Sequence, residues 1–118
     1  MPRAKDNLLP KPTAELACVF FAIGDRTRLQ LIVVLCAGGA FSIAQLTATT
    51  AMTRQAVTKH LQVLAEAGLV HHVKVGRERL WQFEPPQMEA ARQSLDIIAR
   101  QWEQALGRLK FVMESDGD

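Results

Sequence analysis

The sequence is poor in the residues that build disulfide frameworks, metal centres and membrane spans. Its 118 residues include two cysteines, three histidines and no tyrosine. Cys18 and Cys36 are too few and too isolated to predict a disulfide framework. No apolar run reaches the ~18 residues of a membrane span, and the N-terminus lacks the long apolar core of a secretory signal. We therefore expect a cytoplasmic protein that has no membrane partner.

The residue patterns of common enzymes are missing as well. No Ser/His/acid set, glycine-rich phosphate loop or pair of acidic residues in a cleft can be assembled from the spacings. We therefore expect no catalytic residues, no cofactor and no enzymatic activity. The composition, 48% hydrophobic and 22% charged, is that of an ordinary folded protein, and the length suits one compact domain with a modest core.

Charge is distributed unevenly along the chain. Residues 53–79 hold five basic residues against two acidic ones, whereas residues 80–118 hold four basic and seven acidic ones. A basic middle segment suits a polyanionic partner. Charge alone leaves open the alternative that this is only a solvated face.

The first half of the chain reads as a series of short helices. Thr13 is a candidate N-cap for a helix that ends at Gly24, and Asp25 is a candidate cap for the next. Ser42 and Gln45 fit a capping box at the start of a third helix. In the second of these helices the predicted buried stripe consists of Leu29, Ile32, Val33 and Cys36.

A fourth helix, predicted over 54–67 with Thr53 as its cap, has two distinct faces. At 100° per residue its apolar residues Val57, Leu61 and Leu64 share one narrow sector. The opposite side carries long polar side chains, and Gly68 ends the helix. We expect the apolar side to pack on the domain and the polar side to face outward.

A hairpin and a long helix complete the chain. The runs "LVHHVKV" and "RLWQFE" alternate around Gly76-Arg77-Glu78 and predict a β-hairpin that is closed by Pro85-Pro86. From Gln87 to about Met113 apolar residues recur every three or four positions. A helix of that length spans about 40 Å, which is longer than so small a domain. Part of its stripe is therefore expected to pack against a second copy.

Together these elements predict a mainly α fold with a β-hairpin wing, a dimeric winged helix-turn-helix. We divide the chain into a flexible arm (1–12), the winged helix-turn-helix domain (13–84) and a dimerisation helix with a short tail (85–118). The helix over 54–67 suits a DNA major groove, and the basic hairpin suits the flanking backbone or minor groove. The expected DNA-binding residues are Arg54, Gln55, Thr58, Lys59, His60, Gln62, Lys74, Arg77 and Arg79.

Three stretches in order resemble the ArsR-type (ArsR/SmtB-like) winged-helix regulators of bacteria. They are "AIGDRTRLQLIVVL", "TRQAVTKHLQVLAEAGLV" and "GRERLWQF", and the resemblance covers about residues 13–84. The helix-turn-helix turn departs from the family pattern, since Thr50 stands where a leucine is usual and Ala51 where a glycine is usual.

The resemblance implies a homodimer that represses transcription at a double-stranded DNA operator until an effector, here an unidentified small molecule, arrives. In this family the first and last helices form the interface. The corresponding residues here are Leu16, Phe20, Leu95, Ile98, Trp102, Leu106 and Leu109.

The metal sites of many such regulators have no counterpart in this sequence. The first helix of the DNA-binding motif holds no Cys, His or acidic residue, and the last helix holds no His. His71 and His72 are adjacent on a predicted strand and so point to opposite faces. We expect no metal site and two buried, inert cysteines. Two alternatives stay open: a thiol switch that uses Cys18 and Cys36, and a winged-helix module that binds protein.

Overall fold

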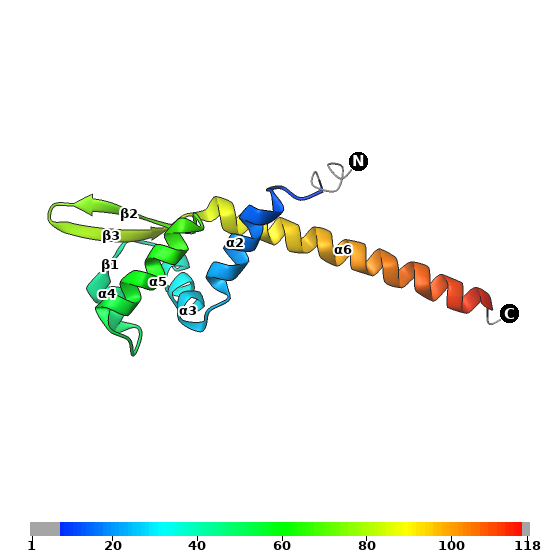
Figure 1. Ribbon diagram of the computed structural model, residues 1–118, viewed down its shortest axis with the longest axis horizontal. Coiled ribbons are helices and arrows are strands. Elements are labelled where there is room, and N and C mark those ends of the chain that lie inside the picture. The colour runs from blue at the N-terminus through cyan, green and yellow to red at the C-terminus, as the bar shows by residue number, and fades with distance from the viewer. Residues whose placement is uncertain (1–7, 117–118) are drawn as a thin grey trace.

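The computed structural model describes residues 8–116, which form five helices and one small sheet (Figure 1). The predicted arm over 1–12 lies mostly outside this range, and so do the last two residues of the predicted tail. In chain order the elements are α2 (Thr13–Ile23), α3 (Arg26–Cys36), β1 (Phe41–Ser42), α4 (Ile43–Ala48), α5 (Arg54–Glu66), β2 (Val70–Val75), β3 (Glu78–Phe83) and α6 (Pro85–Asp116).

The sheet is antiparallel with strand order β1-β3-β2. The predicted hairpin is confirmed, with Lys74 opposite Arg79 and His72 opposite Trp81 in the register. The two-residue strand β1 was not predicted, because two residues show no alternation; it pairs Phe41 with Trp81. This pairing ties the root of the hairpin to the start of α4.

The core lies where α2, α3, α4 and α5 meet the base of the sheet. The predicted apolar side of α5 is confirmed, since Val57, Leu61 and Leu64 are fully buried. Leu46 of α4 and Trp81 of β3 belong to the same cluster. Because its apolar side is held by three helices and the sheet, α5 can leave its polar side facing outward.

The predicted stripe of α3 is wrong except for Ile32. The buried residues are Leu31, Ile32 and Leu35, whereas Leu29 is 47% exposed, Val33 is 65% exposed and Cys36 is exposed. Seven of the eight residues over 29–36 are apolar, so periodicity alone does not select the side that packs. Tertiary contacts select it instead.

The helix starts follow the capping predictions with one exception. The Asp25 carboxylate accepts the N–H groups of Thr27 and Arg28 at 2.9 and 3.1 Å. Ser42 and Gln45 form the predicted capping box, and Thr53 caps α5. Thr13 is not a cap: it is the first residue of α2, and Pro12 precedes it without a side-chain cap.

Helix α6 begins two residues before the predicted start, at Pro85, because proline fits the first turn of a helix, where an N–H would have no helical partner. Gln87 Nε2 donates to Glu15 Oε1 of α2 at 2.7 Å and anchors this end. Beyond Ser94, the last fully buried residue of the described part of the chain, α6 runs clear of the other elements (Figure 1). The molecule measures 72 × 32 × 21 Å.

The overhanging part of α6 carries an apolar stripe that nothing in the described chain covers. Its members are between 44% and 65% exposed: Leu95, Ile98, Trp102, Leu106, Leu109 and Met113. Phe111 is also exposed, at 71%, on the opposite side of the helix. Within residues 8–116 no helix combines the length and the apolar character needed to cross a membrane.

Candidate nucleic-acid interface

The outward side of α5 presents a row of polar and basic side chains. Arg54, Gln55, Lys59 and Gln62 are all exposed, while the apolar side of the same helix holds it in the core. Thr58 is half-buried, and its hydroxyl donates to the Arg54 carbonyl at 2.8 Å. Five of the expected DNA-binding residues therefore lie on one surface, which we call the reading face: Arg54, Gln55, Thr58, Lys59 and Gln62.

The turn before α5 is held by a side chain that departs from the family pattern. Thr50 Oγ1 donates to the Thr47 carbonyl at 3.1 Å and accepts the Met52 N–H at 3.1 Å. Between residues 8 and 116, only glycines have positive φ. Ala51 therefore does not sit in a left-handed conformation, and the turn forms without a glycine there.

His60 does not lie on the reading face. Its Nδ1 is 3.3 Å from Arg28 Nη1 and 3.8 Å from Asp25 Oδ2. A guanidinium only donates, so His60 Nδ1 is the acceptor in its contact with Arg28. His60 thus connects α5 to the junction between α2 and α3 and packs between helices, apart from the other expected DNA-binding residues of α5.

Arg28 is the residue at this junction whose role the sequence did not reveal. Its Nε donates to the Ala22 carbonyl at 2.6 Å and its Nη2 to the Phe21 carbonyl at 3.3 Å, so it satisfies the end of α2. Its guanidinium also lies 5.3 Å from the centre of the Phe21 ring. The Arg28 N–H hydrogen bond holds the pKa of the Asp25 carboxyl below its ordinary value. In the sequence, the only indication of this role is that Arg28 belongs to the Asp-x-Thr-Arg pattern.

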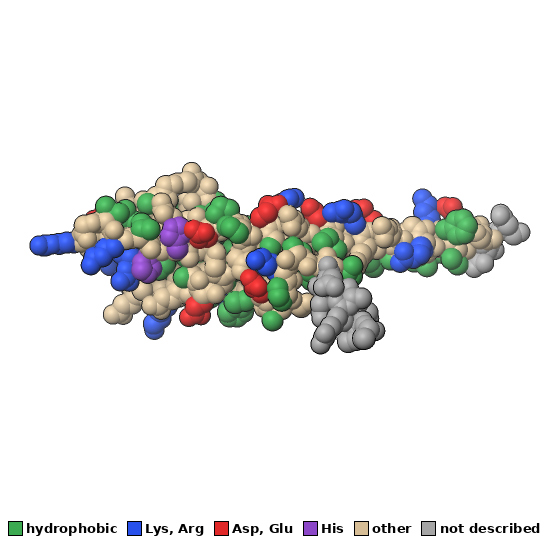
Figure 2. Space-filling view, turned by 90° about the horizontal axis from the view of Figure 1, so that it is seen from above, with side chains coloured by type: hydrophobic (Ala, Val, Ile, Leu, Met, Phe, Trp, Pro, Cys, Tyr) green, Lys and Arg blue, Asp and Glu red, His purple; other side chains and the backbone are tan. Residues whose placement is uncertain are grey.

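The hairpin formed by β2 and β3, which we call the wing, carries three exposed cations. Lys74, Arg77 and Arg79 surround its tip, where Gly76 takes the left-handed conformation that the tight turn requires. None of the three makes an ion pair with another residue of the described chain. Figure 2 shows that Lys and Arg side chains gather at this end of the molecule.

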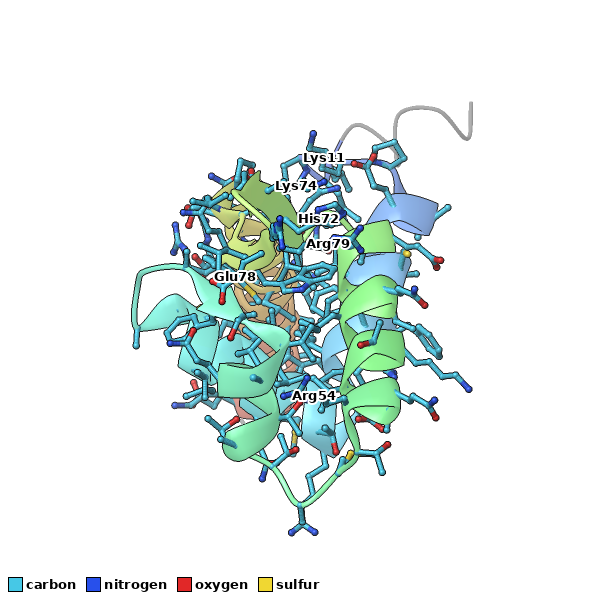
Figure 3. All side chains as sticks on the ribbon, turned by 90° about the vertical axis from the view of Figure 1, so that its left-hand side faces the viewer. Lys11, Arg54, His72, Lys74, Glu78 and Arg79 are labelled. Atoms are coloured by element: carbon cyan, nitrogen blue, oxygen red, sulfur yellow. The ribbon has the colours of Figure 1, made fainter. Side chains whose placement is uncertain are left out.

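The reading face and the wing meet at a shared boundary. A shallow hollow of 680 Å³ is lined by the five residues of the reading face together with Ile43. A second hollow of 390 Å³ lies against the wing and shares Ile43 and Thr58 with the first. In the end-on view of Figure 3, Arg54 lies beside α5 at the lower end, with Lys74 and Arg79 above it. The fold thus places eight of the nine expected residues on adjoining surfaces.

The remaining histidines and the cysteines are spread over separate surfaces. His71 contacts Gln82 and Glu84, whereas His72 packs edge-on against Trp81, which confirms that they point to opposite faces. Within residues 8–116 no three His, Cys, Asp or Glu side chains group together as metal ligands would. Cys18 and Cys36 are exposed, so the prediction that both are buried is wrong.

This geometry suits a DNA duplex. The major groove of B-DNA admits an α-helix, and glutamine and lysine side chains match the hydrogen-bonding edges of adenine and guanine. Arg54, at the first turn of α5, lies where phosphates meet free helix N–H groups. Cations on a protruding hairpin suit the phosphates beside the groove.

Comparisons with known proteins agree with this geometry. The family described as "Helix-turn-helix domain" matches residues 23–73. The HTH-type transcriptional regulator Rv2034 of Mycobacterium tuberculosis is 35% identical over 97 residues, which cover 82% of this chain and 87% of the relative.

Among solved structures, an ArsR-like transcriptional regulator from Rhodococcus sp. RHA1 superposes with a TM-score of 0.79 at 36% identity and covers 86% of this chain and 93% of its own. The homodimeric winged helix-turn-helix DNA-binding domain of Mb0332 from Mycobacterium bovis shares the fold at 22% identity, with a TM-score of 0.57 and coverage of 80% and 84%. The chain therefore belongs to the ArsR family of winged helix-turn-helix, DNA-binding transcriptional regulators and is not an enzyme.

Proposed function

We propose that the protein is a homodimeric repressor that binds an inverted-repeat operator through α5 and the wing of each subunit. The observation that carries this proposal is that the exposed reading face adjoins three wing cations that make no ion pair within residues 8–116. In an inverted repeat, two copies of α5 related by a two-fold axis read half-sites about 10 base pairs apart, or a multiple of that distance.

The two surfaces have different roles in this proposal. Gln55 and Gln62 offer paired hydrogen bonds to adenine edges, and Lys59 reaches guanine or a phosphate. Lys74, Arg77 and Arg79 contact the sugar-phosphate backbone or the minor groove beside the half-site. The reading face then sets the preferred sequence, and the wing contributes affinity that does not depend on sequence.

The exposed stripe of α6 supports the homodimer. Six large apolar side chains on one side of an overhanging helix are more than a monomeric protein usually leaves in water. From α2, Phe20 is half-buried and Phe21 is 67% exposed, so both offer surface to a partner. Leu16 is 3% exposed and supports α2 from inside the monomer. The Mb0332 domain, which shares the fold, is described as homodimeric.

The two alternative functions have less support. A thiol switch needs accessible thiolates, and both cysteines are exposed. Neighbouring atoms nevertheless remove part of the water around the Cys36 thiol, and this desolvation raises its pKa above the ordinary value and lowers its thiolate fraction at neutral pH. A protein-binding face needs apolar anchors, whereas the reading face consists of polar and basic residues.

An effector that relieves repression is expected to be a small molecule.

A footprinting experiment tests the proposal. The DNA upstream of the gene is searched for an inverted repeat, and binding of a duplex that carries it is measured with hydroxyl-radical footprints. We expect protection of two symmetric segments whose centres are about one or two helical turns apart. A single protected segment at saturating protein, or protection without sequence preference, contradicts the proposal.

A further inference from the structure

Ile43 lies at the point where α4, α5 and the wing meet. It directly follows Ser42, which pairs with Leu80 of β3 and also caps α4 through the capping box with Gln45. Helix α4 packs against α5. The backbone that carries Ile43 is therefore fixed both to the wing and to the helix that presents the reading face.

Ile43 is one of two residues that line both hollows beside α5. The 680 Å³ hollow places it beside the polar and basic side chains of the reading face, and the 390 Å³ hollow places it beside the wing cations and Trp81. The Ile43 side chain is half-buried, and it packs in part against the core, whereas Trp81 is only 3% exposed. Among the described residues that line the two hollows, Ile43 is therefore the one apolar residue with much surface left to offer.

Thr58 is the second residue that both hollows share, and it adds a methyl group at the same boundary. Its hydroxyl donates to the Arg54 carbonyl at 2.8 Å, so this proton is not available to an acceptor on a base edge. The Thr58 methyl and the Ile43 side chain remain as apolar contact groups. We call these two residues the apolar junction.

We propose that the apolar junction binds the C5-methyl group of one thymine in each operator half-site, which makes Ile43 a specificity-determining residue outside α5. Thymine is the standard DNA base that presents a methyl group in the major groove, beside its O4 acceptor, and apolar side chains and threonine methyls contact that group. This assignment rests on the proposed function, because it requires α5 in the major groove. It adds a preference for thymine that glutamine and lysine, which pair with adenine and guanine edges, do not supply.

Replacement of thymine by deoxyuridine tests the proposal, because deoxyuridine lacks the C5-methyl group and keeps the hydrogen-bonding atoms of the base. Each symmetric pair of thymines in the operator duplex is replaced in turn, and the Kd of the wild-type protein is measured by fluorescence anisotropy. We expect one pair to be sensitive. Its replacement should raise the Kd about fourfold in one half-site and about 15-fold in both, the loss expected for one buried methyl-sized group in each subunit.

Protein variants identify the residue that contacts this methyl group. We expect the effect of uracil in one half-site to fall below twofold in Ile43→Ala, and to be reduced in Thr58→Ser, which keeps the hydroxyl and removes the methyl group. Ile43→Val replaces Ile43→Ala if the alanine variant does not fold, and it should also reduce the effect. Ile23→Ala is the matched control, because Ile23 is half-buried against the core as Ile43 is, but lines neither hollow. It should keep the full effect.

The outcomes separate this proposal from the proposed function. If the wild type prefers the operator to a scrambled duplex but no thymine pair responds to uracil, the methyl contact is refuted and the proposed function stands. The methyl contact is also refuted if Ile43→Ala keeps the full effect, or if Ile23→Ala loses it as well, because another residue or a change in DNA shape then produces the effect. If the wild type does not distinguish the operator from the scrambled duplex, the proposed function fails and the methyl contact fails with it.

Discussion

Ile98 lies within the exposed stripe of α6, and its truncation measures how much that stripe contributes to dimerisation. The side chain is 54% exposed in the monomer, so about half of the ~1.5–3 kcal/mol gained by fully burying an isoleucine remains available to a partner. A symmetric dimer uses Ile98 twice. Ile98→Ala is therefore expected to weaken dimerisation by about 1.5–3 kcal/mol, which raises the dimer Kd about 10- to 150-fold.

Sedimentation equilibrium over a range of protein concentrations gives this Kd. Arg100→Ala is the matched control, because Arg100 lies on the opposite side of α6 at 100° per residue, and its Kd is expected to stay within about twofold of the wild type. The double variant Ile98→Glu/Leu106→Glu places carboxylates in the seam and is expected to give monomers or unfolded chains. A wild-type protein that stays monomeric at micromolar concentration refutes the reasoning, as does an Ile98→Ala variant with an unchanged Kd.

Three further predictions concern the effector, a turn and a helix cap. One equivalent of Zn(II), Cd(II) or As(III) is expected not to release the protein from DNA; release that persists in a Cys18→Ser/Cys36→Ser variant would point to a metal site elsewhere. Gly68→Ala is expected to lower the free energy of unfolding by about 1–2 kcal/mol, because Gly68 has a φ of +78° and the new Cβ meets Gln87 Cγ at 3.0 Å. Gly107→Ala, which adds a Cβ in open surroundings on a helix, is expected to raise the free energy of unfolding by about 0.5–1 kcal/mol. Urea unfolding of both variants measures the two changes. The Asp25 carboxyl has a folded pKa below its ordinary value of 3.8, so the stabilisation that it provides is present above that value and disappears as the pH falls through the folded pKa. The difference in Tm between the wild type and the Asp25→Asn variant should therefore shrink in acid. A difference that stays constant would contradict this cause.

The sequence predicted those parts of the fold that local chemistry determines. The caps at Asp25, Ser42 and Thr53 were predictable because a side-chain oxygen next to free N–H groups acts within one turn. The wing was predictable because its alternation and Gly76 act between neighbours in the chain. The apolar side of α5 was predictable because its polar residues leave only one side to bury.

Features that depend on distant residues were not predictable. The segment 29–36 of α3 is apolar almost all round, so only its neighbours determine that Leu31 is buried and Val33 is exposed. The contact of His60 with Arg28 joins residues that are 32 positions apart in the chain, and no local pattern indicates it. The 390 Å³ hollow beside the wing depends on Ile43, Thr58 and the wing coming together, and no spacing in the sequence indicates that they do.

The proposed function depends above all on a division of roles, in which α5 reads the DNA sequence and the wing binds DNA without reading it. Binding titrations of Gln55→Ala, Lys59→Ala and Arg77→Ala against specific and scrambled duplexes, at several salt concentrations, test this division. We expect Gln55→Ala and Lys59→Ala each to weaken binding of the specific duplex alone, by about 1–3 kcal/mol for each base contact that the variant removes. We expect Arg77→Ala to weaken both duplexes alike and to lower the salt slope by about one for each phosphate contact that it removes, counted over both subunits. If Arg77 carries the sequence preference while Gln55 and Lys59 are neutral, the two roles are reversed and the proposed division is wrong.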